Sequence, residues 1–293
     1  MLHSAITIMT PLLFAAAGGL FTELAGMLNI ALEGLLLTGA FSAIVCSYFT
    51  GSTALGVIAA VLASTALAAL LGAATLKLRA NVFIAGLAAN LFAGGITVVL
   101  SSRIFASRGV LSFNQIPRLK NIVIPGISGI PVLGDIFSNH SFYVYAGWIF
   151  LLAAWILLYK TPFGFRLRAC EKHQAALVSL GLRPDRYRFA GFLISGLACG
   201  LGGSYLTLNL GAFVPNISSG KGWTALVIIF LGSRRPAGIL AGTFAFGLAE
   251  AFSNYAQGAL NAPADFILAI PSFFTLLLMI AVSVYTKRKQ GFM

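Results

Sequence analysis

The chain has 293 residues, of which 59% are hydrophobic and only 9% are charged. A soluble globular domain carries about 25% charged residues, so this composition cannot supply a water-facing surface and predicts a protein that lies mostly in lipid. The formal net charge is +12, but the basic residues stand between hydrophobic segments. This pattern indicates membrane topology and lipid-headgroup contacts and argues against a nucleic-acid partner.

Hydropathy predicts a single membrane domain that comprises the whole chain, 1–293. A bilayer-crossing helix needs about 20 mostly apolar residues. The seventh segment of this kind is the weakest, because only Trp223 to Leu231 is continuously apolar, and it is compatible with a half-helix. The predicted fold class is all-α, a polytopic transmembrane bundle of about 8–10 spans. The nine candidate segments are about 5–22, 29–50, 53–76, 81–101, 141–159, 188–210, 222–234, 236–256 and 265–285.

The basic residues predict the orientation of these segments. If the C-terminal cluster 287–289 is cytoplasmic, the segment 160–188 and the pairs Lys77/Arg79 and Arg234/Arg235 are cytoplasmic too. Cytoplasmic loops carry an excess of Lys and Arg, so this orientation is favoured over its reverse. It places the N-terminus outside, unless segment 29–50 does not fully cross. The basic residues left outside are Arg103, Arg108, Arg118, Lys120 and Lys221.

Two connections are long. The outer one, about 102–140, contains several Pro and Gly residues and is expected to be loop-like. The inner one, about 160–187, contains a stretch compatible with a helix over 166–180. Gly181 ends this stretch and Pro184 follows, which is the usual order of helix-stop residues. A short helix is therefore predicted on the cytoplasmic face.

The spacing of the segments shows a weak internal repeat. The segments 29–50, 53–76 and 81–101 recur in spacing as 213–234, 236–256 and 265–285. In the predicted topology the two sets run in opposite directions. Inverted repeats of this kind are typical of transporters whose pathway lies at the interface between the repeats.

Motifs of the common enzyme classes are absent from the sequence. The nearest approach to a phosphate-binding loop has Pro215 where the first Gly is needed, so the chain itself is not expected to bind ATP in that way. No HExxH or GxSxG occurs, and the three Cys residues lack metal-site spacing. We expect no catalytic residue, no metal and no cofactor, and predict that the chain is not an enzyme.

Two acidic residues fall within or near apolar segments, Glu33 and Glu250. An acid inside the bilayer is costly, about 2.5–3.5 kcal/mol at a helix centre on insertion scales. Such a residue either lines a pathway or ties one helix to another through hydrogen bonds, and both alternatives are open here. The same two alternatives apply to Asn29 and Asn90.

Four sequence pieces, in order and with matching spacing, resemble the permease subunits of ABC importers. The resemblance covers about 20–285 and points to the branch that includes nucleoside, simple-sugar and branched-chain amino acid permeases. The first piece leans toward the nucleoside and simple-sugar side. Within that branch the chain resembles the shorter permease of a two-permease system, and a related subset moves riboflavin. The pieces are Asn29-Ile30-Ala31-Leu32-Glu33-Gly34, 81–91, Pro162-Phe163-Gly164-Phe165-Arg166-Leu167-Arg168 with Ala175-Ala176 and Gly181, and 220–226 with Pro236-Ala237-Gly238.

The resemblance implies that the inner loop holds a coupling helix that docks on an ATP-binding subunit. Ala175 and Ala176 would allow close approach, with Gly181 at the family spacing, and Arg166, Arg168 and Glu171 would supply polar contacts. Relatives usually have a Gly-Glu-Asn-like stretch before the two Ala residues, where this chain has 171–174, so the pairings are expected to differ.

The resemblance also implies partners and a location. Two copies of an ATP-binding subunit would hydrolyse ATP, and a second, different permease would complete the pathway in a bacterial cytoplasmic membrane. An extracytoplasmic substrate-binding protein or lipoprotein would dock on the 102–140 and 211–221 loops. Asn29, Glu33, Asn90 and Glu250 are the candidate pathway residues. The main alternative is a self-sufficient secondary transporter whose coupling ion uses Glu33 or Glu250, and a channel comes third.

Overall fold

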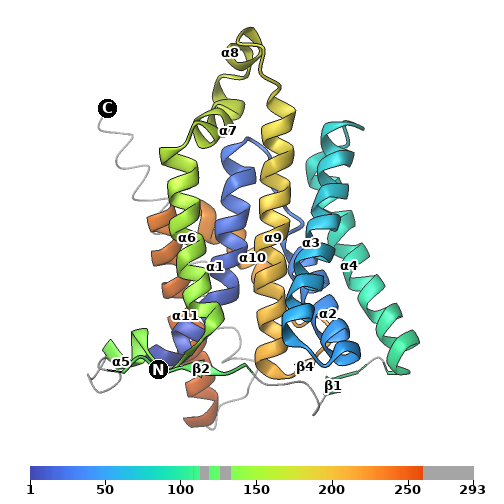
Figure 1. The fold of residues 1–293 in the computed structure, drawn as a ribbon, viewed down its shortest axis with the longest axis vertical. Helices are drawn as coiled ribbons and strands as arrows, with labels where there is room; N and C mark the ends of the chain where they lie inside the picture. The colour runs from blue at the N-terminus through green and yellow to red at the C-terminus, as the bar shows by residue number, and fades with distance from the viewer. Residues whose placement is uncertain (108, 113–118, 126–132, 260–293) are drawn as a thin grey trace.

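The computed structural model describes residues 1–107, 109–112, 119–125 and 133–259. Seven of the described helices are long and apolar enough to cross a membrane, which confirms the predicted all-α bundle (Figure 1). The last predicted span, 265–285, lies outside the described residues. The seven helices are α1 (Leu2–Leu24), α2 (Leu32–Thr50), α3 (Thr53–Leu76), α4 (Val82–Phe105), α6 (Phe142–Lys160), α9 (Pro184–Leu210) and α11 (Pro236–Ala259).

Short elements cover the two ends of the bundle. At one end lie α7 (Pro162–Lys172) and α8 (Gln174–Ser179), and at the other lie α5 (Leu133–Phe137) and four two-residue strands (Figure 1). The outer connection, expected to be loop-like, thus contains short regular pieces. The strands form two antiparallel pairs, β1 (Leu111–Ser112) with β4 (Ala212–Phe213) and β2 (Asn121–Ile122) with β3 (His140–Ser141).

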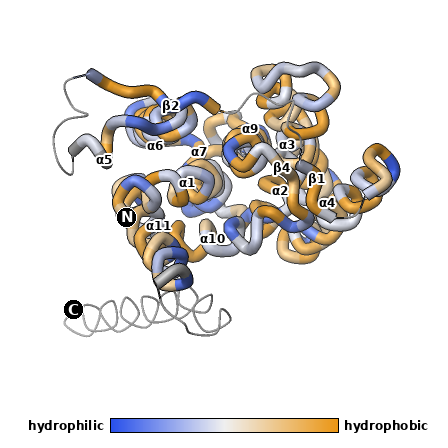
Figure 2. The backbone as a smooth tube through the Cα atoms, turned by 90° about the horizontal axis from the view of Figure 1, so that it is seen from below, coloured by the Kyte–Doolittle hydropathy of each residue, from blue (hydrophilic) through white to orange (hydrophobic). Residues whose placement is uncertain are grey.

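The helices differ greatly in how much of their surface the protein covers. In the apolar part of α1, 89% of the residues are buried, whereas the value for α4 is 17%. Helices α1 and α9 lie side by side in the middle of the bundle (Figure 2). Large apolar side chains such as Leu70, Ile84 and Leu91 are exposed on the outer helices. A surface of this kind is stable only when lipid is its solvent.

Small residues allow α9 to pack closely on α3. A Cβ added to Gly196 would lie 2.6 Å from the Ala68 Cβ, and one added to Gly200 would lie 2.7 Å from the Val61 Cα. Since these distances leave no room for a side chain, the two glycines fix the spacing of the helices. This is the role that small residues usually have between membrane helices.

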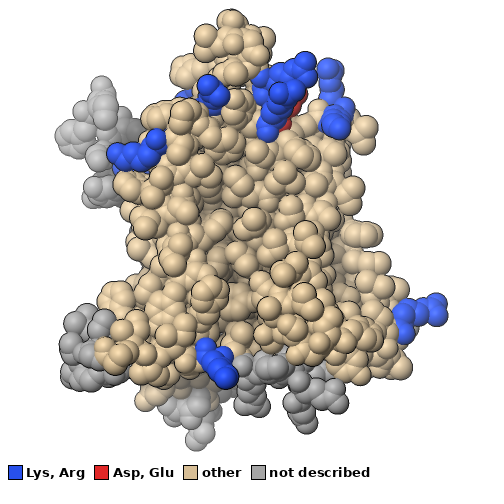
Figure 3. All heavy atoms as spheres, in the orientation of Figure 1, with Lys and Arg blue, Asp and Glu red and all other residues tan. Residues whose placement is uncertain are grey.

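The charged side chains on one face of the molecule lie at the two ends of the bundle (Figure 3). On the face shown in Figure 3, Lys and Arg side chains gather at the two ends and leave the band between them without charge. Helix α1 begins at the end opposite α7 and α8 (Figure 1). If α7 and α8 are cytoplasmic, as their basic residues indicate, the N-terminal end of α1 lies outside.

Helices α2 and α10 both begin inside the bundle. Helix α10 (Lys221–Leu231) has 11 residues and therefore extends about 16 Å, roughly half of the hydrocarbon core. The predicted half-helix is thus confirmed. Helix α2 begins at Leu32, three residues later than predicted, because the chain from 26 to 31 is not helical.

The directions of these helices agree with an inverted repeat. Helix α2 leads away from the α7 end and α10 leads toward it (Figure 1). The next pair, α3 and α11, also runs in opposite directions (Figure 1). The third pair would join α4 to the segment 265–285, which lies outside the described residues.

The prediction of one inner helix over 166–180 is wrong. The structure has two helices, α7 and α8, separated at His173, whose φ of −132° and ψ of 42° are not helical. Helix α7 also begins earlier, at Pro162, where the Thr161 hydroxyl accepts a hydrogen bond from the Gly164 amide at 3.3 Å. The predicted stop is confirmed, because Gly181 has φ +73° and α9 begins at Pro184.

Candidate functional site: a mid-membrane junction and a cytoplasmic tip

The starts of α2 and α10 meet inside the bundle. We call Glu33, Ser218, Gly220 and Gly222 the junction. A Cβ at Gly222 would overlap the backbone nitrogen of Glu33, so only glycine fits where the two helices touch. Both helix starts present amide N–H groups that lack a partner within their own helix. The junction therefore needs an acceptor.

Glu33 supplies that acceptor. Its Oε1 accepts hydrogen bonds from the Ser218 hydroxyl at 2.6 Å and the Gly220 amide at 2.8 Å. Its Oε2 accepts one from the Gly222 amide at 2.7 Å. The positive end of the α10 dipole also favours a carboxylate at this position. This geometry corresponds to an acid that ties two helices together.

Asn90 and Asn29 hold the non-helical segment that precedes α2. Asn90 accepts a hydrogen bond from the Gly34 amide at 2.7 Å and donates one to the Ile30 carbonyl at 2.9 Å. Asn29 donates to the Ser195 hydroxyl at 2.9 Å and accepts from the Ala31 amide. The segment is thereby fixed to α4 and α9. A direct role of Asn29, Glu33 and Asn90 in the pathway stays a prediction.

Glu250 lies close to the junction, on α11, and forms an ion pair with Lys221. The Lys221 Nζ and the Glu250 Oε1 are 2.8 Å apart, and the two side chains are 17% and 31% exposed. Lys221 is the first residue of α10, so it lies within the bundle rather than in the outer loop where its sequence position placed it. Across the described ranges, no three His, Cys, Asp or Glu side chains gather in a way that could hold a metal ion.

At the end of the bundle where α7 lies, α8 projects beyond the other helices (Figure 1). We call residues 174–181 the tip. Ala175 and Ala176 are exposed, and so are the apolar side chains of Val178 and Leu180, at 57% and 75%. Leu177 is buried and attaches α8 to the rest of the chain. Apolar groups exposed outside the membrane-spanning helices indicate a surface for another protein.

The polar residues predicted to contact an ATPase lie on α7 and have partners within the chain. Arg166 donates to the Tyr187 hydroxyl at 3.2 Å. The Arg168 guanidinium lies over the rings of Tyr159 and Phe165, at 4.6 and 5.0 Å from their centroids. Such cation–π contacts stabilise a charged group beside aromatic rings. In this structure, Arg166 and Arg168 position α7.

Two further arginines connect α7 to the bundle, and sequence reasoning assigned them to topology alone. Arg234, in the turn between α10 and α11, pairs with Glu23 at 2.8 Å and with Glu171 at 2.7 Å. Through Arg234, Glu171 on α7 is thus connected to Glu23 on α1 and to the turn that follows α10. Because the partners of Arg234 are 63 or more residues away in sequence, the sequence indicated this cluster only through the opposite charges of its members.

Arg188 forms the second connection. Its guanidinium donates to the carbonyls of Ala25 and Cys170, at 3.2 and 3.0 Å, and to the Gln174 side chain at 3.0 Å. Burial raises the pKa of the Cys170 thiol above its usual value. The inner face of α7 is therefore packed against α1 and α9, whereas most of the tip is exposed and is held through Gln174 and Leu177.

Known proteins share this sequence and architecture. Residues 1–283 match the family model described as "Branched-chain amino acid transport system / permease component". The guanosine ABC transporter permease protein NupQ of Bacillus subtilis is 34% identical over 252 residues, which cover 83% of this chain and 78% of the relative. The nucleoside ABC transporter permease protein NupC of Lactococcus lactis is 32% identical over 281 residues, or 92% of this chain and 88% of the relative.

A solved structure agrees at the level of the fold. An inward-facing conformation of a putative metal-chelate type ABC transporter gives a TM-score of 0.51 at 16% sequence identity and covers 94% of this chain and 85% of the other. At this identity the likeness concerns the fold alone. With the family match over nearly the whole length, it leads to one conclusion: the chain belongs to the branched-chain amino acid transport system / permease component family of ABC transporter permeases.

Proposed function

We propose that this chain forms one half of the translocation pathway of an ATP-driven importer of nucleosides. The observation that carries the proposal is its similarity to permeases named for guanosine and nucleoside transport, which extends over 83% and 92% of the chain. A second, different permease would supply the other half. The chain would act in a bacterial cytoplasmic membrane without catalysing a reaction itself.

ATP hydrolysis would take place in a separate subunit, present in two copies, that binds the tip. The exposed side chains of Ala175, Ala176 and Val178 support this part of the proposal. Two adjacent alanines let a groove of another protein approach the backbone closely, and the apolar neighbours gain free energy when they leave water. Arg166, Arg168 and Glu171 would then set the position of α7 behind the docked surface.

A route for coupling leads from the tip to the middle of the membrane. Glu171 on α7 is joined to Arg234, and Arg234 follows the end of α10. The opposite end of α10 carries Gly222 and its bond to Glu33. A displacement of α7 would therefore act on α10, a rigid rod of 11 residues, and through it on the junction.

The polar groups of the membrane interior would have two different roles. Lys221 and Glu250 keep exposed area, at 17% and 31%, and we assign them to the wall of the pathway, where a polar solute needs hydrogen-bonding groups. Asn29, Glu33 and Asn90 would hold that wall in place. High affinity for the solute would come from an extracytoplasmic binding protein, which would dock on the loops at the end where α1 begins.

Copurification and transport test the proposal. The chain, expressed with its chromosomal neighbours and isolated through a tag, should bring an ATPase and a second permease with it. Vesicles that hold the complex and the binding protein should take up radiolabelled guanosine only when ATP is supplied. Uptake by the chain alone, without ATP, would instead establish the secondary transporter. Riboflavin and simple sugars stay as alternative solutes, and competition with labelled guanosine separates them.

A further inference from the structure

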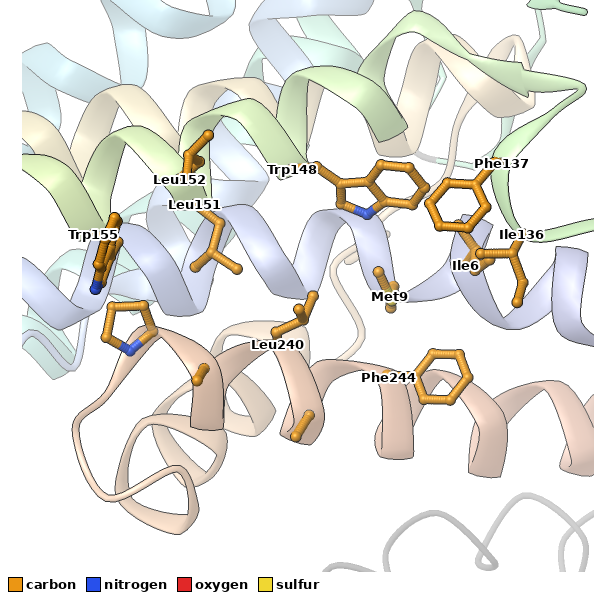
Figure 4. Close-up of a pocket in the computed structure, with 13 residues that line it drawn as sticks. Ile6, Met9, Ile136, Phe137, Trp148, Leu151, Leu152, Trp155, Leu240 and Phe244 are labelled. Atoms are coloured by element: carbon orange, nitrogen blue, oxygen red, sulfur yellow. The ribbon is translucent and has the colours of Figure 1, made fainter. Parts of the chain in front are cut away.

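A groove with apolar walls runs along one flank of the bundle, away from the junction. It has a volume of about 770 Å³ and lies between α1, α6 and α11, with α5 at its outer end. Figure 4 shows Trp148, Leu151 and Trp155 of α6 on one side and Leu240 and Phe244 of α11 on the other. Ligand sites in proteins have volumes of about 300–1,000 Å³, so this groove has the size of a binding site.

The groove is long and open to the side. From Pro236 to Phe244 its wall on α11 extends about 12 Å, at 1.5 Å per residue, which is most of one leaflet of the hydrocarbon core. Ile6 and Phe137 continue the lining toward the outer end. Leu152, Trp155 and Leu240 are 56%, 42% and 42% exposed along it. An occupant that enters from the bilayer and lies parallel to the helices fits this shape.

Two cations stand at the cytoplasmic end of the groove. The Lys160 Nζ lies 5.7 Å from the centre of the Trp155 ring, and Trp155 lines the groove. Arg235 directly precedes Pro236, which lines it too. The Tyr159 hydroxyl donates a hydrogen bond to the Arg234 carbonyl at 3.4 Å, which brings the end of α6 close to the turn before α11. Lys160 follows Tyr159 and Arg235 follows Arg234, so these two cations lie at the same end of the groove.

These two cations are available to a ligand. Within the described part of the chain, neither Lys160 nor Arg235 forms an ion pair, and both side chains are exposed. The neighbouring Arg234 differs, because Glu23 and Glu171 occupy its guanidinium. The positive charge at the rim is thus uncompensated, while the groove below it is apolar.

We propose that this groove binds an anionic phospholipid of the cytoplasmic leaflet. One acyl chain would lie between α6 and α11, and the phosphate would lie between Lys160 and Arg235. Basic pockets between membrane helices on the cytoplasmic side suit such headgroups, and a Trp ring at the boundary is placed between the two environments. The site would brace α6, which leads into α7, against α11.

Charge complementarity favours a lipid over another part of this chain. The predicted span 265–285 is apolar, but Lys287, Arg288 and Lys289 follow it. A helix formed by that span and seated in the groove would bring these cations toward Lys160 and Arg235, where like charges repel. A lipid phosphate brings the opposite charge to the same place.

Lipid binding to the purified, delipidated full chain tests the proposal. Native mass spectrometry and thermal unfolding would be recorded with dioleoyl phosphatidylglycerol and dioleoyl phosphatidylcholine, which differ only in the headgroup. We expect tighter binding and a higher unfolding temperature with phosphatidylglycerol. The double variant Lys160→Gln/Arg235→Gln should weaken phosphatidylglycerol binding about 30-fold, from the usual contribution of a basic residue near an anionic surface. Its binding of phosphatidylcholine, whose choline cation offsets the phosphate charge, should change much less.

A matched pair of cytoplasmic cations gives the control. Lys77→Gln/Arg79→Gln removes the same charge at the same membrane surface, away from the groove, and should leave lipid binding unchanged. Ala241→Trp fills the groove and should abolish binding of both lipids, while its unfolding temperature without lipid shows that it folds. Equal losses in the two double variants would overturn the proposal, as would equal affinity for the two lipids. Efficient crosslinking of Ala241→Cys to a cysteine within 265–285 would also overturn it.

Discussion

The junction and the tip are opposite kinds of structure in one chain. At the junction, the carboxylate of Glu33 meets three donors, and the backbones touch so closely that Gly222 admits no side chain. At the tip, Leu180 is 75% exposed and α8 has only six residues. The junction is complete within the chain, whereas the tip leaves the apolar side chains of Val178 and Leu180 exposed. The difference separates residues that build the subunit from residues that we propose for binding to an ATPase.

The largest expected effect follows from removing the carboxylate of the junction. Glu33→Ala would leave the Ser218 hydroxyl and the amides of Gly220 and Gly222 without an acceptor. Each orphaned buried donor costs about 1–3 kcal/mol, or about 3–9 kcal/mol for three. Because Gly220 is only half-buried, we expect the free energy of unfolding to fall by about 3–6 kcal/mol. Thermal unfolding in detergent and the yield of folded protein measure this loss.

Glu33→Gln tests whether Glu33 has a structural role, because the amide keeps one oxygen acceptor and the shape of the side chain. It should recover a large part of the stability lost in Glu33→Ala. If Glu33→Gln is as stable as the parent but transports nothing, Glu33 acts in the pathway itself, and its assignment to the structure of the junction is wrong.

A substitution at the tip should impair ATPase binding and leave stability unchanged, which is the opposite of the effect expected at the junction. Ala176→Arg places a long cation where a close contact is proposed, so the ATPase should no longer copurify while the unfolding temperature stays within about 1 °C of the parent. The loss of a binding hot spot near 2 kcal/mol corresponds to about 30-fold in affinity. Retention of the ATPase on an affinity column is the measurement.

Ala54→Arg is the matched control for this change. Ala54 is also an exposed alanine near the start of a helix, but α3 begins at the other end of the bundle. ATPase retention should equal that of the parent. If Ala176→Arg binds the ATPase normally, the tip is not the docking surface.

An intermediate effect is expected at Arg234, which joins the two regions. Arg234→Gln leaves Glu23, only 7% exposed, without its cation. Since Arg234 itself is 39% exposed, we expect a loss of about 1–2 kcal/mol, less than for a fully buried pair. A double-mutant cycle with Glu171→Gln should show coupling of about 0.5–1 kcal/mol. Strict additivity would show that Glu171 and Arg234 do not interact.

The smallest effect concerns the chemistry of one thiol. Burial raises the pKa of Cys170, so less thiolate is present at pH 7.5 than for an exposed cysteine, and alkylation accelerates as the pH rises. In a background without Cys46 and Cys199, a maleimide should react more slowly with the buried Cys170 than with Lys172→Cys, two residues away and exposed. Equal rates would show that α7 is not packed as described.

The presence of the described spans was predictable because hydropathy is a local property, whereas several of their ends differ from the prediction by a few residues. The continuous apolar stretch of only nine residues, Trp223 to Leu231, already indicated that α10 is short. The break at His173 was missed, because 174–180 has the composition of a helix and nothing local marks an interruption. At that break, Arg188 from another helix binds the Cys170 carbonyl and the Gln174 side chain, and Arg188 lies well beyond the break in sequence.

The sequence allowed the residues of the candidate sites to be predicted, but not the groups that these residues contact. Glu33 stood out as an acid in an apolar segment, and Ala175 and Ala176 stood out by resemblance. The partners of Glu33 are a hydroxyl and two backbone amides that lie 185 to 189 positions further along the chain. Backbone amides carry no sequence signature, so no pattern in the sequence pointed to the junction. Lys221 was similarly placed by its charge in an outer loop, although its partner Glu250 lies on a spanning helix.

The length of chain between Glu33 and Gly222 has a consequence for biosynthesis. Chains grow at about 5–20 residues per second, and Gly222 follows Glu33 by 189 positions. For about 10–40 s the ribosome thus holds a membrane segment whose acidic side chain has not met its donors. We expect the nascent α2 to remain beside the insertion machinery until α10 emerges.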